Sequence, residues 1–277
     1  MPNNRRKGTG VASKLTDLES LLRNMGSVLV AHSVGVDSTF LAVVSHRVLG
    51  DKSLAVTASS PLYSESEVRS AQEIAHIFGL RHLIIRTQEM KNPLFVANTP
   101  DRCYYCKQEL FHHLQKIAAK EGLCWVADGS NHDDLSDHRP GWRAATELGI
   151  RSPLYEVGLT KDEIRILSRD MALPTWDKPS LACLASRLPY GTEVTIDVVS
   201  RIGQAEDYLR GLGVRQVRVR HHGDTARIEV DPDNMAILVV RRHEVVAQLQ
   251  KLGYTYISLD LQGYRSGSLN ETLRSSS

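Results

Sequence analysis

The stretch Ser27-Val-Leu-Val-Ala-His-Ser-Val-Gly-Val-Asp-Ser38 decides the fold of this chain. Residues 28–31 form a short apolar run rich in β-branched side chains, as expected of a strand buried in a parallel sheet. A turn of small residues follows, and residues 39–49 have the length and apolar spacing of a helix. The first N–H groups of a helix lack partners within it, and the macrodipole adds positive charge. This strand–turn–helix therefore predicts an anion site.

Neither common nucleotide signature fits this turn. It contains no Gly-x-x-x-x-Gly-Lys-Ser/Thr, which argues against a P-loop kinase or GTPase, and no Gly-x-Gly-x-x-Gly, which argues against a dehydrogenase-type fold. The turn instead resembles the Ser-Gly-Gly-x-Asp-Ser loop of the PP-loop ATP pyrophosphatases, which cleave ATP to AMP and pyrophosphate. Ser33, Gly35, Asp37 and Ser38 match that loop. Val34 replaces its first glycine, and a positive φ there would be costly for a β-branched residue.

Composition places the chain among ordinary globular proteins. With 277 residues it exceeds the usual size of one domain, so two domains are expected. A formal charge of +2 gives no sign of a nucleic-acid partner or an anionic membrane. No apolar run approaches the roughly 20 residues that span a bilayer, and the basic N-terminus lacks the apolar segment of a secretory signal. A cytoplasmic protein is predicted, whose four cysteines serve as metal ligands or reactive thiols rather than disulfides.

Strands alternate with helices through the first two thirds of the chain. We expect strands at 28–31, 53–57, 82–86 and 125–128, with helices at 14–25, 39–49, 65–78 and 109–121. This alternation predicts an open, mostly parallel, Rossmann-like α/β sheet. Ligands of such sheets bind beyond the carboxyl ends of the strands, so the chemistry is expected near Ser33, Ser59 and Asp128.

Past Pro189-Tyr-Gly191 the pattern changes. We expect a helix at 197–212, two paired strands at 217–221 and 226–230, a helix at 234–252 and a strand at 254–259. This order predicts a smaller α+β domain. The predicted domains are therefore residues 1–189 and 190–277.

The cysteines allow three interpretations. Cys103-Tyr-Tyr-Cys106 is the only Cys-x-x-Cys, a spacing that lets two thiols bind one metal ion or form a redox pair. Cys183 lies among small residues and close to Arg187, which suits a reactive thiol, whereas Cys124 in an apolar run is expected to be buried and inert. Cys103, Cys106 and Cys183 could anchor a [4Fe-4S] cluster with one open iron. Alternatively Cys183 acts alone as nucleophile or sulfur donor, or none of the thiols binds a ligand.

Two groups of charged residues are further candidates. Asp128-Gly-Ser-Asn-His-Asp-Asp134 follows the expected fourth strand, with Asp137 and Arg139 beyond it, and this density of carboxylates suits Mg²⁺ and pyrophosphate. Arg218 and Arg220 lie two apart on an expected strand and so share one face, where Arg187 could join them. Clustered guanidinium groups bind phosphate or carboxylate, although a solvated strand face explains the spacing equally well.

Taken together these stretches resemble one subgroup of the PP-loop superfamily. It is the ATP-dependent sulfur transferase family that makes the pyridinium bisthiocarboxylate mononucleotide precursor of the nickel-pincer cofactor, and it is associated with lactate racemase activation. The resemblance runs in order through nearly the whole chain. Its matching stretches are 33–38, 103–107, 128–134, 137–141, 151–154, 176–179, 183–192 and 218–220.

The resemblance implies a two-step reaction. A substrate carboxylate attacks the α-phosphate of ATP, giving an acyl-adenylate and Mg²⁺-bound pyrophosphate, and sulfur then displaces AMP. ATP would be held by Ser33, Gly35, Asp37, Ser38, Ser59, Asp128 and Gly129. The substrate's phosphate would be held by Arg187, Arg218 and Arg220. The three-cysteine pattern implies a [4Fe-4S] cluster on Cys103, Cys106 and Cys183. Cys183, Asp37 and Arg187 are the expected catalytic residues, and family members form homo-oligomers.

Two other functions remain open at this point. A tRNA thiolase of the same superfamily also joins a PP-loop to three cysteines, but this chain shows no basic stripe or added RNA-binding domain. A non-catalytic nucleotide-binding protein would follow if Val34 disables the loop.

Overall fold

The computed structural model describes residues 4–136, 140–179, 182–265 and 267–270. It divides the chain into two compact units. The first comprises Met1–Ser60, Glu65–Glu89 and Cys103–Ser180, and the second comprises Pro61–Ser64, Met90–Arg102 and Leu181–Ser277. Two short segments from the first half of the sequence thus belong to the second unit. The division into domains at residue 189 stays a prediction.

A four-stranded parallel sheet forms the centre of the first unit. Its strands are β1 (Val28–Ala31), β2 (Ser53–Ser59), β3 (His82–Arg86) and β4 (Trp125–Ala127). Their order is β3-β2-β1-β4, and every pairing is parallel. The chain therefore moves outward from β1 in both directions, which leaves a crevice between the carboxyl ends of β1 and β4. Such switch points are where ligands bind in open α/β sheets.

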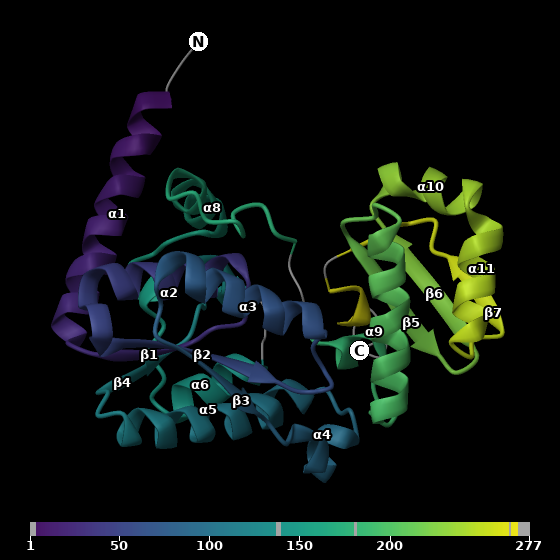
Figure 1. Cartoon of the computed structure of the whole chain (residues 1–277), viewed down its shortest axis with the longest axis horizontal. Coiled ribbons are helices and arrows are strands. Elements are labelled where there is room, and N and C mark those ends of the chain that lie inside the picture. Colours follow the sequence, from purple (N-terminus) through teal and green to yellow (C-terminus); the bar gives the residue numbers. More distant parts are fainter. Residues whose placement is uncertain (1–3, 137–139, 180–181, 266, 271–277) are drawn as a thin grey trace. The chain divides into compact units, whose positions relative to one another are not determined.

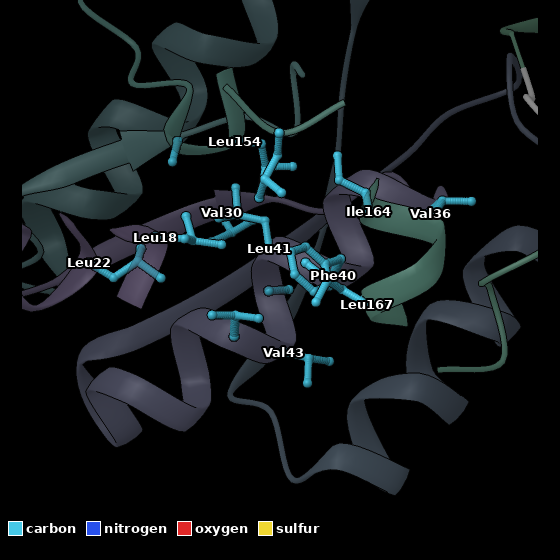
Figure 2. Packing of buried hydrophobic residues seen from close by; sticks show 14 of the residues in the cluster. Leu18, Leu22, Val30, Val36, Phe40, Leu41, Val43, Leu154, Ile164 and Leu167 are labelled. Carbon is cyan, nitrogen blue, oxygen red and sulfur yellow. The ribbon is translucent and has the colours of Figure 1, made fainter. Parts of the chain in front are cut away.

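Helices cover both faces of this sheet (Figure 1). They are α1 (Asn4–Met25), α2 (Val36–Leu49), α3 (Glu65–Phe78), α5 (Arg102–Lys120), α6 (Pro140–Glu147), α7 (Pro153–Glu156) and α8 (Lys161–Asp170). On one face α1, α2 and α8 pack on β1, where Leu18, Phe40 and Ile164 are fully buried (Figure 2). On the other face Phe111 and Leu114 of α5 fill a second core. The predicted open parallel α/β fold is confirmed.

The second unit is a small α+β assembly. Its helices are α4 (Pro93–Val96), α9 (Ile196–Gly211), α10 (Met235–Val240) and α11 (Arg242–Lys251), and its strands are β5 (Val217–His222), β6 (Thr225–Val230) and β7 (Tyr256–Leu259). β5 and β6 form the predicted antiparallel hairpin, and β7 pairs with β6 in parallel. Apolar side chains of α9, α10 and α11 form one core with this sheet. The smaller C-terminal α+β part is thereby confirmed.

Several element boundaries differ from the prediction. α2 begins at Val36, so Asp37 and Ser38 lie in its first turn, and α5 begins at Arg102, well before residue 109. The single helix expected at 234–252 is two helices separated at Arg241. Within the described residues no helix is long and apolar enough to cross a membrane.

Candidate functional site

The turn between β1 and α2 has the geometry of an anion site. Gly35 is the N-cap of α2, and no side chain caps the helix there. The N–H groups of the first turn therefore remain available to a ligand. The Ser33 main-chain N–H donates to Ser38 Oγ at 3.1 Å, and the two serine hydroxyls lie 3.0 Å apart. Ser33 is exposed at this edge, whereas Ser38 is buried.

Val34, which stands where the related loop has its first glycine, has a backbone conformation that is unusual for a valine. Its φ is +59°, in the left-handed region that favours glycine. The side chain is only 1% exposed and packs with Ala71 and Ile74 of α3. Burying a valine contributes about 1.5–3 kcal/mol, comparable with the roughly 1–3 kcal/mol of backbone strain that it offsets. The turn thus keeps a glycine-like backbone without the glycine.

Asp37 is held by a lysine that sequence reasoning did not identify. Lys161 Nζ lies 2.6 Å from Asp37 Oδ2, across 124 positions of sequence. The Lys161 main-chain N–H donates to Asp133 Oδ2 at 2.8 Å, which fixes the start of α8 beside the loop after β4. Burial raises the pKa of Asp37, and the Lys161 ammonium opposes that rise only in part. The carboxylate therefore lies in a setting that favours additional positive charge.

The loop after β4 closes the other side of the crevice. Asp128 Oδ1 accepts from Ser152 Oγ at 2.8 Å and from the Ser130 N–H at 3.1 Å, so its carboxylate shapes this loop. A Cβ atom on Gly129 would lie 2.9 Å from the Ser38 nitrogen, closer than side chains pack. Only glycine lets the loop approach the start of α2 this closely. Ser59 ends β2 at the same edge of the sheet, while Asp137 and Arg139 lie outside the described residues.

Replacing Gly129 by alanine is expected to push the β4 loop away from α2. The clash involves backbone atoms of Ser38, so the free energy of unfolding should fall by about 1–3 kcal/mol. Pyrophosphate binding, measured by calorimetry, should weaken about tenfold or more, because misplaced groups lose much of their binding geometry. Gly10→Ala in α1 is the control, since nothing lies within 4 Å of its new Cβ. Equal effects in both variants would contradict this account.

A buried histidine anchors the turn from beneath. His32 directly precedes Ser33 and is 2% exposed. Its Nδ1 and Nε2 atoms each lie 3.1 Å from a threonine hydroxyl, that of Thr57 on β2 and that of Thr39 on α2. Thr57 Oγ1 also lies 2.9 Å from Nε2 of His82 on β3. Burial lowers the pKa of His32 to about 3, so the ring is neutral at physiological pH.

This histidine predicts a measurable pH dependence of stability. Because the pKa of His32 is lowered on folding, the unfolded chain binds the extra proton between pH 6.5 and about pH 3, and stability falls as the pH falls through that window. Between pH 7 and pH 5 the loss from this group is about 2 kcal/mol. In urea unfolding, the fall in the free energy of unfolding between pH 7 and pH 5 should be smaller by about 2 kcal/mol in His32→Asn than in the wild type. His112→Asn, at an exposed position of α5, should keep the wild-type slope; equal slopes in all three proteins would contradict the assignment.

None of the four cysteines, all of which the structure describes, forms a disulfide. Cys103 and Cys106 lie in the first turns of α5, exposed and half-buried, and Cys183 precedes the short helix η4 (Leu184–Arg187) and is half-buried. The first two belong to the first unit and Cys183 to the second. Within the described ranges, no group of three or more His, Cys, Asp or Glu side chains could hold a metal ion. Cys124 is exposed and lies outside β4, so the expectation that it is buried was wrong.

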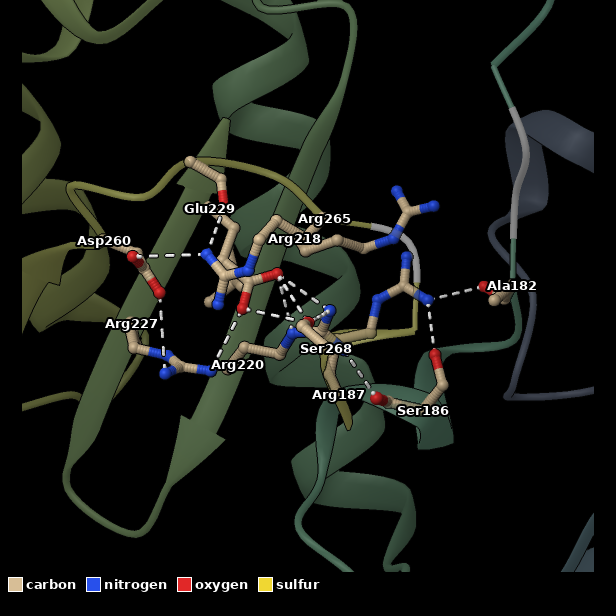
Figure 3. A network of polar contacts seen from close by, with 12 residues as sticks. Ala182, Ser186, Arg187, Arg218, Arg220, Arg227, Glu229, Asp260, Arg265 and Ser268 are labelled. Carbon is tan, nitrogen blue, oxygen red and sulfur yellow. Dashed lines mark hydrogen bonds and ion pairs between the residues drawn. The ribbon is translucent and has the colours of Figure 1, made fainter. Parts of the chain in front are cut away.

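The three predicted arginines are buried in the second unit (Figure 3). Nε of Arg187 donates to Glu206 at 2.7 Å, and Nη2 of Arg220 donates to Glu229 at 2.8 Å. Burial lowers the pKa of Arg218 to about 10, and the charge of Arg187 adds to this effect. The arginines are therefore not on a solvated strand face. Glu206 and Glu229 are the buried ion-pair partners of Arg187 and Arg220.

The structure therefore brings the predicted loop residues together, and it adds two residues that the sequence did not predict. Ser33, Asp37, Ser38 and Gly129 gather at the crevice between β1 and β4. His32 and Lys161 were not anticipated. Thr160 and Glu163 form a capping box that marks the start of α8, yet local spacing gave no sign that Lys161 reaches Asp37. The roles assigned to the site residues stay predictions.

The sheet order and the turn at 33–38, with its Asp37 carboxylate paired to Lys161, fit the nucleotide-binding α/β fold of the PP-loop class. In agreement, the chain is 24% identical over 189 residues to a component of the glutamine-hydrolysing GMP synthase of Archaeoglobus fulgidus, covering 64% of this chain and 59% of that one. It belongs to the family of pyridinium-3,5-bisthiocarboxylic acid mononucleotide synthases and is an ATP-dependent sulfurtransferase.

Two relatives match over nearly the whole chain. The Lactiplantibacillus plantarum protein of that family name is 38% identical over 264 residues, which is 95% of this chain and 96% of the relative. An uncharacterized protein of Synechocystis sp. is 46% identical over 263 residues, covering 94% and 98% of the two chains. No protein-family profile matches.

Proposed function

We propose that this chain converts a carboxylate of pyridinium-3,5-biscarboxylic acid mononucleotide into a thiocarboxylate during synthesis of the nickel-pincer cofactor. In the first step a carboxylate oxygen attacks the α-phosphorus of ATP, and the bond to the bridging oxygen of the β-phosphate breaks. An acyl-adenylate and pyrophosphate result. In the second step sulfur attacks the acyl carbon, and AMP departs with the bonding electron pair. The product named for the L. plantarum relative supports this substrate class.

The N-terminus of α2 is the observation that carries the proposal. Its uncapped N–H groups, with Ser33 and Ser38, offer donors to the pyrophosphate end of ATP. Asp37 would hold Mg²⁺, because burial raises the pKa of this carboxylate and a divalent cation would supply the missing positive charge. Bound there, the ion would neutralise charge that develops on the leaving pyrophosphate. Gly129 keeps this space open.

The substrate's phosphate is assigned to the arginine cluster of the second unit. A guanidinium whose pKa burial lowers to about 10 is one whose positive charge an added anion would stabilise, which favours Arg218 as a ligand. Arg220, two residues along the same strand, is the second proposed ligand. Arg187 would add its charge nearby while its own nitrogens stay bonded to Glu206 and to main-chain carbonyls. Clustered arginines provide the geometry that phosphate groups prefer.

The sulfur source is assigned to the three cysteines of the sequence pattern. Cys103, Cys106 and Cys183 form no disulfide and none is buried, so their chemistry fits the three protein ligands of a [4Fe-4S] cluster. Such a cluster supplies an iron that can hold an extra sulfide for delivery. The alternative makes Cys183 itself the sulfur donor. Assembly as a homo-oligomer and a part in lactate racemase maturation stay predictions of the resemblance, and a cytoplasmic location stays a prediction from the composition of the chain.

The reaction is tested by incubating the anaerobically purified protein with ATP, Mg²⁺, sulfide and the biscarboxylate mononucleotide. AMP and pyrophosphate should form in equal amounts and only with the mononucleotide present, and mass spectrometry should show oxygen replaced by sulfur in the product. Absence of AMP under these conditions would overturn the proposal. If AMP forms but no thiocarboxylate product appears, the enzyme only adenylates the substrate and the proposed sulfur step is refuted.

The sulfur source is tested separately by measuring iron and acid-labile sulfide per chain. About four of each in the wild type, lost in Cys183→Ala but retained in Cys124→Ala, would support the cluster. Cys124 is a suitable control because it is an exposed thiol outside the predicted ligand set. No iron after reconstitution would refute the cluster, and mass loss at Cys183 after turnover would then identify the sacrificed sulfur.

A further inference from the structure

The main chain around Cys183 is bound by three buried arginines. Nη1 of Arg187 donates to the carbonyl oxygen of Ala182 at 2.6 Å (Figure 3). It also donates to the carbonyl oxygen of Cys183 itself at 3.0 Å. Nη1 of Arg102 donates to the Ala185 carbonyl at 3.0 Å. Nη1 of Arg220 donates to the Ser186 carbonyl at 2.9 Å. Four of the five carbonyl groups in 182–186 thus accept from guanidinium groups, and these contacts all lie within the second unit.

These arginines are unusually buried for charged side chains. Arg102, Arg187 and Arg220 are 2%, 1% and 7% exposed. Burying a guanidinium group is costly unless its N–H groups donate hydrogen bonds. Here the carbonyl oxygens of 182–186 accept some of those bonds. Main-chain carbonyls cannot be removed by mutation, so these hydrogen bonds can be tested only by replacing the arginines.

Arg187 has a particular geometry within this group. One edge of its guanidinium faces Glu206, with Nε and Nη2 donating to the two carboxylate oxygens at 2.7 and 2.9 Å. Its remaining nitrogen, Nη1, points at the Cys183 segment and also lies 2.9 Å from Ser186 Oγ. The side chain therefore links the buried helix α9 to the backbone of the cysteine. A direct role as phosphate ligand would require it to give up one of these bonds.

We propose that Arg187, with Arg102 and Arg220, is a positioning residue that fixes the backbone of 182–186 and thereby the location of the Cys183 thiol. With the backbone held, only rotation about the Cα–Cβ bond moves the sulfur, which confines it to a few rotamers. Groups held in the reacting geometry gain rate without gaining affinity. The part of this inference that concerns sulfur transfer rests on the proposed function, whereas the ordering of the segment does not.

Hydrogen–deuterium exchange tests the ordering directly. Within the segment the Leu184 N–H donates to Leu62, the Ser186 N–H to Cys183 and the Leu188 N–H to Ala185. In Arg102→Met these amides should exchange about tenfold faster, because the segment opens locally more often. This variant breaks no ion pair between described residues. Arg210→Gln is the matched control: it removes another arginine bonded to Glu206, but one whose described bonds go only to side chains of α9.

A second variant protects the test against simple misfolding. Arg187→Gln combined with Glu206→Gln removes both charges of the pair together, so neither is left buried alone. Its expected effects are faster exchange in peptides covering 182–188 and a kcat for thiocarboxylate formation lowered about tenfold or more. KM for ATP and for the mononucleotide should stay within about twofold of wild type.

Two results would overturn the inference. One is unchanged exchange at 182–188 in both Arg102→Met and the double variant. The other is a raised KM for the mononucleotide with unchanged kcat, which would make Arg187 a phosphate ligand. Because exchange is measured without substrate, a failure of the proposed reaction leaves the ordering test intact, and the two failures are distinguishable.

Discussion

Replacing Glu206 by glutamine is expected to lower the free energy of unfolding of the second unit by about 3–5 kcal/mol. Glu206 is fully buried and accepts hydrogen bonds from Arg187, from Arg210 and from the Val219 main-chain N–H. Glutamine keeps the shape but removes the charge, so the Arg187 guanidinium is left buried opposite a neutral amide. Removing one partner of a buried ion pair strands the other, and that desolvation cost dominates the effect.

The pH dependence gives this prediction a second check. Burial by itself would raise the pKa of Glu206, but the neighbouring Arg187 charge brings it below the ordinary value of 4.5. The carboxylate therefore stabilises the fold above about pH 4.5, and this contribution is lost as the pH falls through the folded-state pKa. The difference between wild type and Glu206→Gln in urea unfolding should be full at pH 7 and shrink below pH 4.5.

Asp207→Asn is the matched control for Glu206. The neighbouring carboxylate accepts from the same Arg210 at 2.7 Å, but its side chain is 49% exposed. Exposed ion pairs contribute about 0–1 kcal/mol, so this variant should stay close to wild type. Comparable losses in the two variants would show that burial does not decide the effect and would contradict the prediction.

The fold was largely predictable because its strongest signals are local. Buried parallel strands need continuous apolar runs, and those at 28–31 and 53–57 agree with β1 and with the buried part of β2. The errors have identifiable causes. The apolar run around Cys124 predicted burial, but the strand begins one residue later, which leaves the thiol exposed at the sheet edge. The apolar spacing at 234–252 continues across a break at Arg241, so periodicity alone could not separate α10 from α11.

The site was predictable where its residues lie in short motifs, namely the turn 33–38 and the loop that begins at Asp128. The turn 33–38 carries its own geometry, so Ser33 and Ser38 could be assigned to it directly. Lys161 and Asp37 are 124 positions apart, and no local spacing of residue types in the sequence indicates their contact. Because side chains alternate between the two faces of a strand, the sequence correctly placed Arg218 and Arg220 on one face. It could not indicate that this face is buried, or that Arg220 pairs with Glu229.

Replacing Lys161 by methionine is expected to lower kcat/KM for AMP formation by about 10²–10³-fold. Lys161 places a positive charge 2.6 Å from Asp37 in the first turn of α2, beside the donors proposed for pyrophosphate. A fixed cation at a site of developing negative charge stabilises the transition state more than the ground state. Methionine keeps the length and the apolar stem of the side chain but removes the charge. The measurement is release of AMP and pyrophosphate over a range of ATP concentrations.

Lys14→Met separates this catalytic effect from loss of an ion pair. Lys14 and Lys161 have side chains that are each 31% exposed, and Lys14 pairs at 2.7 Å with Glu163, which lies on the same helix α8. Both variants should therefore lose about 1 kcal/mol or less of stability. If only Lys161→Met loses activity, the charge at Asp37 acts on the reaction. The two lysines have equally exposed side chains and differ in which carboxylate they contact. Equal losses of activity in the two variants would therefore mean that α8 needs its ion pairs only to stay in place.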